Sequence, residues 1–166
     1  MTATAKVEDL SLLRELHHDK LALYLRHIAV ARHVGDYEFN NAYQYMINRE
    51  EAHLKWLESA ISDLGGTPDV LSEPVVTPGA GKKNDKFMAL VAEDSRMSDA
   101  LVSKWKPRAV DIRSERHRKL VGVILGETLE QKRFSDHVTA GQDDLLGRRM
   151  AGASTGDGVM SVRWKS

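Results

Sequence analysis

The sequence predicts an all-α protein, a four-helix bundle in which one long crossover joins the second helix to the third. Apolar residues recur at helical spacing in four long stretches of the chain. No segment shows the sustained alternation of apolar and polar residues that is typical of strands. The breaks between the four stretches are short, long and short in that order, and one long crossover of this kind is a known variant of the four-helix bundle.

The first two stretches are expected to form a helical hairpin. The first covers residues 10–31 and ends before Gly35, a residue type that commonly follows the end of a helix. The second covers residues 39–60 and stops at the Gly-Gly-Thr-Pro sequence of residues 65–68. Because glycine followed by proline is a strong helix stop, the second helix is predicted to end there.

The crossover comes next and is followed by the second hairpin. Residues 65–83 contain three of the four prolines and four glycines, a composition that suits an irregular connection. We expect this segment to pack along the bundle without forming a sheet. The third helical stretch covers residues 87–105 and is ended or kinked by Pro107. The fourth covers residues 120–138 and stops at Gly141.

The length of the chain, 166 residues, suits one domain. We assign residues 1–140 to the bundle and residues 141–166 to an irregular, Gly-rich C-terminal tail. The glycines of the tail do not form a nucleotide-binding motif, because no predicted strand precedes them and no lysine completes a P-loop.

Composition limits the classes of function. Lys+Arg and Asp+Glu both total 24, so no excess of positive charge is present to attract nucleic acid or an anionic membrane, and neither partner is expected. The absence of cysteine excludes disulfides and thiolate metal sites. No apolar run reaches the roughly 20 residues of a membrane-spanning helix, and the first residues lack the apolar segment of a signal peptide. These observations predict a cytoplasmic protein.

The informative residues are polar ones at positions where the helical pattern calls for apolar side chains. Burying a charge without a partner costs several kcal/mol, so such residues indicate a metal site, a network of partners or a wet cavity. Six side chains able to bind metal are expected to face the core: His17 on the first helix, Glu50 and His53 on the second, Asp94 on the third, and Glu127 and Glu130 on the fourth.

These six positions repeat at a constant distance along the chain. The same 77 residues separate position 17 from 94, position 50 from 127, and position 53 from 130. Glu50 and His53 form a Glu-x-x-His pair, and residues three apart lie on the same face of a helix. That spacing suits two side chains that contact neighbouring metal ions about 3.5–4 Å apart. The repetition is stronger evidence than one isolated pair.

Each of these positions also has a simpler interpretation. Glu50 has charged neighbours and His17 has a second histidine beside it, so both fit a solvated helix face. A change of one residue in helical phase exchanges Asp94 for Glu93, and Glu130 lies in a Glu-Gln-Lys-Arg run that is typical of a solvent-facing surface. Four other histidines are expected at the surface or its boundary: His27, His33, His117 and His137.

Several of these segments resemble the ferritin-like superfamily of dinuclear carboxylate proteins, in particular its bacterioferritin and rubrerythrin branches. They are Tyr-Leu-Arg-His at residues 24–27, Arg-Glu-Glu-Ala-His-Leu-Lys-Trp-Leu at residues 49–57 and the helix stop at residues 64–68. The resemblance covers roughly residues 8–140 and not the tail. It implies a ferritin-like bundle that runs up, down, down and up.

The resemblance also implies a set of metal ligands. In that superfamily each half of the bundle supplies a terminal Glu, a bridging Glu and a terminal His. Here a His stands at the first terminal Glu position and a Glu at the second terminal His position, so two histidines and four carboxylates are kept in total. Carried over, the set is His17, Glu50 and His53 from the first half and Asp94, Glu127 and Glu130 from the second, with Glu50 and Glu127 as the bridging pair.

A set of this kind implies a dinuclear Fe or Mn centre. Both histidines belong to the first half, so one ion would have imidazole ligands, which suit Fe or Zn, and the other only oxygen ligands, which suit Mn. A mixed or zinc-occupied centre is therefore compatible with the ligands as well.

The function that the resemblance implies is that of an oxidoreductase handling ferrous iron, O₂ or peroxide. The reaction stays open, except that an electron-transfer peroxidase of full rubrerythrin type is excluded by the lack of rubredoxin cysteines. The alternative is a metal-free ferritin-like scaffold that acts as an interaction or stress-related protein. The tail shows no sign of the short fifth helix of shell-forming ferritins, so a homodimer is expected.

Overall fold

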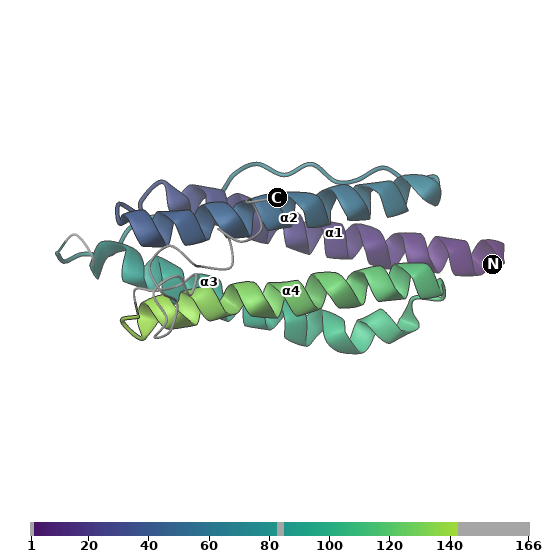
Figure 1. Cartoon of the computed structure of the whole chain (residues 1–166). Coiled ribbons are helices and arrows are strands. Elements are labelled where there is room, and N and C mark those ends of the chain that lie inside the picture. Colours follow the sequence, from purple (N-terminus) through teal and green to yellow (C-terminus); the bar gives the residue numbers. More distant parts are fainter. Residues whose placement is uncertain (1, 83–84, 143–166) are drawn as a thin grey trace, which may run out of the picture.

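The computed structural model of the chain describes residues 2–82 and 85–142. In this part of the chain the regular structure is entirely helical, as predicted, and consists of four α-helices and one short 3₁₀-helix (Figure 1). The elements are α1 (Ala3–Ala31), α2 (Tyr37–Asp63), α3 (Asp85–Arg108), η1 (Ala109–Asp111) and α4 (Glu115–Thr139). None of the described helices is long and apolar enough to span a membrane.

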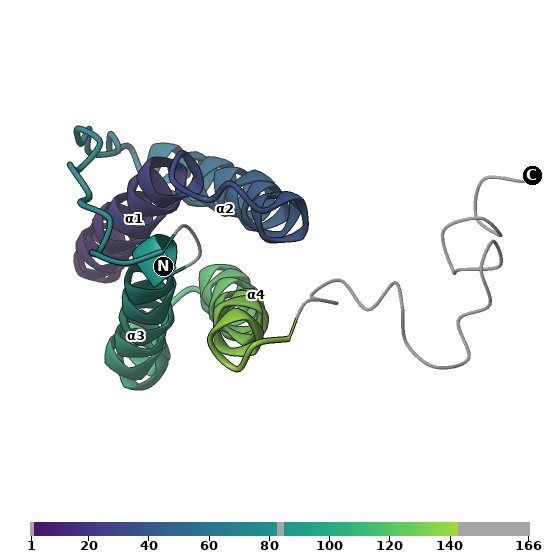
Figure 2. The same ribbon diagram turned by 90° about the vertical axis from the view of Figure 1, so that its left-hand side faces the viewer.

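The helices pack as two antiparallel hairpins, α1 with α2 and α3 with α4. In Figure 1, α1 and α4 run in one direction along the bundle and α2 and α3 in the other. The view along the bundle in Figure 2 shows that α3 lies beside α1, and that α4 lies beside α2. Fewer contacts join α2 to α4 than join the two helices of either hairpin.

The ends of the helices follow local signals in the sequence. The side chain of Thr2 caps α1, that of Asp36 caps α2 and that of Ser114 caps α4, each by accepting a hydrogen bond from a backbone N–H in the first turn. Gly65, with φ of +79°, follows α2, where a left-handed residue closes the last turn. Pro107 lies in the last turn of α3, which ends one residue later and continues as η1.

The crossover returns along the outside of the bundle from the end of α2 to the start of α3 (Figure 1). Its described residues, 65–82, form neither a helix nor a strand, which confirms the predicted irregular connection. Two carboxylates attach it to α1: Asp69 accepts a hydrogen bond from Arg14 Nη2 at 2.9 Å, and Glu73 pairs with Arg32. The predicted tail, apart from residues 141 and 142, lies outside the described residues.

The apolar core of the described chain is divided into two clusters. One cluster surrounds Trp105 and Leu57, and the other surrounds Tyr43 and Phe87. On every helix the residues of the two clusters are separated along the sequence by buried polar residues. This middle section, which we call the polar layer, contains Lys20, His27, Glu50, His53, Asp94 and Thr128.

Candidate functional site

Glu50 is the centre of the polar layer. It lies on α2, is completely buried, and uses both carboxylate oxygens: Oε1 accepts a hydrogen bond from Lys20 Nζ at 2.6 Å, and Oε2 accepts one from His27 Nδ1 at 2.7 Å. Burial by itself raises the pKa of Glu50, but the charges and hydrogen bonds of His27 and Lys20 outweigh it and lower that pKa to about 2. Glu50 is therefore an ionised carboxylate between two basic side chains, Lys20 and His27.

Lys20, on α1, is the first of these two partners of Glu50. Its side chain is fully buried, and its Nζ also donates a hydrogen bond to Thr128 Oγ1 on α4 at 3.2 Å. The Thr128 hydroxyl in turn donates to the backbone carbonyl of Ile124 at 2.8 Å, so its own proton is already engaged. A buried lysine is rare in proteins and is normally paired. Here one ammonium group joins three of the four helices at the centre of the bundle.

His27 is the second of these partners. It was expected near the surface, but that prediction is wrong. The imidazole is buried because position 27 lies one turn beyond Tyr24 on the same face of α1 as Lys20. Burial alone would lower the pKa of His27, yet the adjacent Glu50 carboxylate outweighs it and the pKa is raised. His117 is also buried, contrary to expectation.

Asp94 forms a second buried ionic group on α3. It accepts a hydrogen bond from Arg26 Nε at 2.7 Å and another from the Tyr43 hydroxyl. Burial raises the pKa of Asp94 and outweighs the opposite effects of His27, Tyr43 and Arg26. Burial, followed by the charge of Asp94, raises the pKa of Tyr43 well above its usual value. Asp94 thus has two protein donors of its own and no contact with Glu50.

Glu127 forms a third group, where α2 meets α4. It is about one-third exposed, and its oxygens accept hydrogen bonds from Arg49 Nη2 at 2.6 and 2.7 Å and from His53 Nε2 at 2.7 Å. Burial raises the pKa of Glu127, but the hydrogen bonds from Arg49 and His53 outweigh it and the pKa is lowered. Burial, followed by the charge of Lys20, lowers the pKa of His53, so a neutral imidazole donates to Glu127.

The two remaining predicted residues lie apart from these groups. His17 is buried as expected, but its Nε2 lies 3.5 Å from Glu58 Oε1 and contacts none of the other five. Glu130 does not face the core: its side chain is 64% exposed and pairs with Arg133 at 3.1 Å. Thr128 and Gln131, two of the buried polar residues of α4, lie one position after the predicted Glu127 and Glu130. A helix turns by about 100° per residue, so this shift carries Glu130 to the solvent.

The structure therefore divides the six predicted ligands among several sites. Glu127 meets His53, whereas Glu50 accepts hydrogen bonds from Lys20 and His27. Asp94 accepts its own from Arg26 and Tyr43. Among residues 2–82 and 85–142, no group of three or more His, Asp or Glu side chains is placed to hold a metal ion.

Lys20 is the residue that the sequence analysis missed. Positions 17, 20, 24 and 27 lie on one face of α1, so the helical spacing could have found it. Lysine is normally a surface residue, so its type argued against a buried position.

Comparison with known proteins identifies no family for this chain. No protein-family model matches the sequence, and no curated protein or solved structure matches the chain. The interpretation of the polar layer consequently depends on the chemistry of its own residues.

Proposed function

We propose that this protein is a ferritin-like four-helix scaffold that works without a dinuclear metal centre and acts as a binding protein. One observation carries the proposal: Lys20 Nζ lies 2.6 Å from Glu50 Oε1 in a fully buried layer. Glu50 is the residue to which the resemblance assigns a bridging role between two metal ions. Its positive partner here is an ammonium group that belongs to the protein.

The donor set around Glu50 does not fit a bridging ligand. Both oxygens of Glu50 are occupied, one by Lys20 and one by His27. Two like unit charges about 4 Å apart repel by about 4 kcal/mol at an effective dielectric constant of 20, and a divalent ion doubles that cost. A metal ion beside Glu50 would therefore require Lys20 to leave the layer or to lose its proton.

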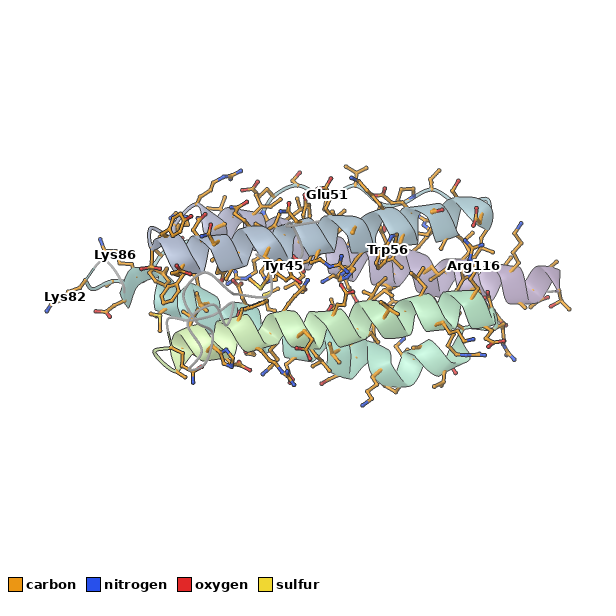
Figure 3. The ribbon with its side chains drawn as sticks, in the orientation of Figure 1. Tyr45, Glu51, Trp56, Lys82, Lys86 and Arg116 are labelled. Atoms are coloured by element: carbon orange, nitrogen blue, oxygen red, sulfur yellow. The ribbon has the colours of Figure 1, made fainter. Side chains whose placement is uncertain are left out.

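Exposed aromatic and apolar side chains on α2 and α4 support a role in binding. Tyr45 and Trp56 on α2 are 50% and 38% exposed, and Val123 on α4 is 50% exposed. Figure 3 shows Tyr45 and Trp56 on the side of α2 that faces α4. Aromatic residues are enriched in binding surfaces. A cytoplasmic location and a homodimer remain part of this proposal, and light scattering of the purified chain measures the second.

A dinuclear Fe or Mn oxidoreductase is the second candidate, and one observation favours it. His17, His27 and His53 are buried, and each has one ring nitrogen without a hydrogen-bond partner in the described part of the chain. Imidazole nitrogens are common ligands of Fe and Zn. For this candidate to hold, the Lys20–Glu50 pair must open.

Metal analysis decides between the two candidates. We expect protein purified from medium supplemented with Fe and Mn to contain neither metal in stoichiometric amount by mass spectrometry. Lys20→Met removes the internal cation, and Lys119→Met is its matched control, because Lys119 is exposed and pairs with Glu115. If Lys20 takes the place of a metal ion, only Lys20→Met gains affinity for added Mn²⁺ or Fe²⁺.

Bound metal in the wild type would be the opposite result, and two variants show whether Glu50 holds it. Stoichiometric Fe or Mn in the wild type would overturn the proposal if Glu50→Gln lost the metal while Glu51→Gln kept it. Glu51 is the suitable control because it is the next residue of α2, is half exposed, and points away from the bundle (Figure 3).

A further inference from the structure

The outer side of α4 is exposed along the length of the helix. In Figure 2, α4 occupies a corner of the bundle, and no other α-helix of the described chain covers its side away from α2 and α3. Exposed residues follow one another on this side at intervals of three and four positions, namely Glu115, Lys119, Gly122, Gly126, Leu129 and Arg133. Residues with this spacing form one row along a helix. We call this row the α4 stripe.

The two glycines at the middle of the α4 stripe have no explanation within the chain. Glycine is the least favourable residue in a helix interior after proline. A methyl group at Gly122 or Gly126 would meet no neighbouring atom within 4 Å, and neither residue is among the described glycines with a positive φ. Glycines one turn apart on a helix let a second backbone approach closely. They are therefore suited to a helix that belongs to another molecule.

Exposed apolar side chains lie beside the two glycines. Leu129 is 41% exposed, and Val123 is 50% exposed. Val123 also lines a surface cavity of about 440 Å³ together with Trp56 of α2, which is 38% exposed. The middle of this face is thus apolar, and charged residues lie towards both of its ends. An apolar centre with a polar rim is typical of protein–protein interfaces.

The charged residues show which partner fits this face. At the start of the stripe Lys119 pairs with Glu115 at 2.7 Å. At its end Arg133 pairs at 3.1 Å with Glu130, which lies beside the stripe. Counted outward from position 124, the charges are positive then negative towards the start of α4, and negative then positive towards its end. A second copy turned end for end would therefore place opposite charges together, whereas a parallel copy would place like charges together.

We infer that the α4 stripe binds the α4 stripe of a second copy of this chain, with the two helices antiparallel about a two-fold axis near position 124. Gly122 of each copy then lies opposite Gly126 of the other, because both are two residues from position 124. Glu115 lies opposite Arg133 of the second copy, because both are nine residues from it. Pairing of identical faces about a two-fold axis is the commonest arrangement of homodimers. The inference rests on the homodimer of the proposed function and names its surface.

Sedimentation equilibrium of the full-length chain measures the association. We expect a dimer with a Kd on the order of 10 μM, because one helix from each copy makes a small interface. Gly126→Leu should raise this Kd at least about tenfold, since the added side chain keeps the two backbones apart. The variant should still fold, because leucine favours a helix more than glycine does. Ser103→Leu is the matched control and should leave the Kd unchanged, since Ser103 is exposed on α3.

Disulfide cross-linking tests the antiparallel orientation and does not depend on the folding of Gly126→Leu. The chain has no cysteine, so each introduced cysteine is the only one present. A mixture of Glu115→Cys and Arg133→Cys should form covalent dimers on mild oxidation. Neither variant alone should do so, because equivalent positions would lie about 27 Å apart along the helices at 1.5 Å per residue. A mixture of Ser103→Cys and Arg133→Cys is the control and should not form covalent dimers.

The possible failures of the inference and of the proposed homodimer are distinguishable. A wild type that remains monomeric at about 1 mM would overturn both, and would leave the face to another segment of the chain or to a different protein. A dimeric wild type with equal Kd values for Gly126→Leu and Ser103→Leu would overturn only the choice of surface. Covalent dimers of Glu115→Cys alone, equal in amount to those of the mixture, would overturn the antiparallel arrangement.

Discussion

The apolar cluster around Trp105 and the polar layer around Glu50 are built from the same four helices, yet different interactions stabilise them. In the cluster, side chains such as Leu57 and Ile124 are completely buried and make apolar contacts, which have no preferred direction. In the polar layer, each oxygen of Glu50 faces one specific donor. A cluster of the first kind tolerates exchanges that conserve volume, whereas the second kind tolerates only changes that keep every buried charge paired.

The largest effect is expected from Glu50→Ala, which leaves the buried Lys20 and His27 without their shared carboxylate. Breaking a buried ion pair in this way should lower the free energy of unfolding by about 3–5 kcal/mol. Urea denaturation followed by circular dichroism measures the change. Glu51→Ala on the exposed face should change stability by no more than about 0.5 kcal/mol. Similar values for the two variants would show that the Glu50 group is not a stabilising network.

Leu57 provides the corresponding test of the apolar cluster. Leu57→Ala should cost about 2–5 kcal/mol through the cavity that it creates, and Leu57→Met less than about 1.5 kcal/mol. In the polar layer the conservative Glu50→Gln keeps the shape but removes the charge, and it should cost more than Leu57→Met. Equal losses for these two conservative variants, measured in the same urea titrations, would remove the contrast between the regions.

The pH dependence of stability should originate in the polar layer. The folded pKa of Glu50, about 2, lies below the ordinary value of 4.5, so its ionised form stabilises the fold above pH 4.5. That contribution is lost as the pH falls from 4.5 towards 2. Between pH 5 and pH 3 the wild type should therefore lose more stability than Glu50→Gln, in unfolding titrations at both pH values. Parallel losses would assign the acid sensitivity to other carboxylates.

The smallest net effect is expected when the whole Glu50 group becomes apolar. In Lys20→Met/Glu50→Leu/His27→Phe no buried charge of the group is left unpaired, and buried ion pairs replaced in this way often leave stability unchanged or increased. The triple variant should lie within about 2 kcal/mol of the wild type and above Glu50→Ala. A triple variant less stable than Glu50→Ala would mean that the network contributes more than the pairing of its charges.

The sequence was sufficient for the number and order of the helices, because glycine and proline mark the breaks between them locally. The starts of α1 at Ala3 and of α4 at Glu115 lie before the apolar stretches from which these helices were predicted. The sequence also predicted that His17, Glu50, His53 and Asp94 are buried, since each interrupts an apolar face. The partners of these residues were not predictable in the same way, because the contact between Lys20 and Thr128 joins positions 108 residues apart.

The orientation of α4 shows a second limit. The helical spacing of position 127 with Ile124 and Phe134 predicted that Glu127 was the buried polar group. In the structure Thr128 is fully buried and Glu127 is partly exposed. Neighbouring positions on a helix differ by about 100°, and the apolar residues of α4 do not fix its orientation more closely than that. Only the packing of α4 against α2 and α3 decides it.

The crossover has a consequence for the continuity of the chain. Val70 and Val75 are 92% and 96% exposed, and side-chain pairs with Arg14 and Arg32 attach this segment to the outside of α1. The contacts of α1 with α3 and of α2 with α4 do not pass through it. A single proteolytic cut near residue 72 should therefore yield two fragments, one per hairpin, that elute together in size-exclusion chromatography and separate only in denaturant. The two hairpins then remain associated as a complex of two peptides, although the chain between them is cut.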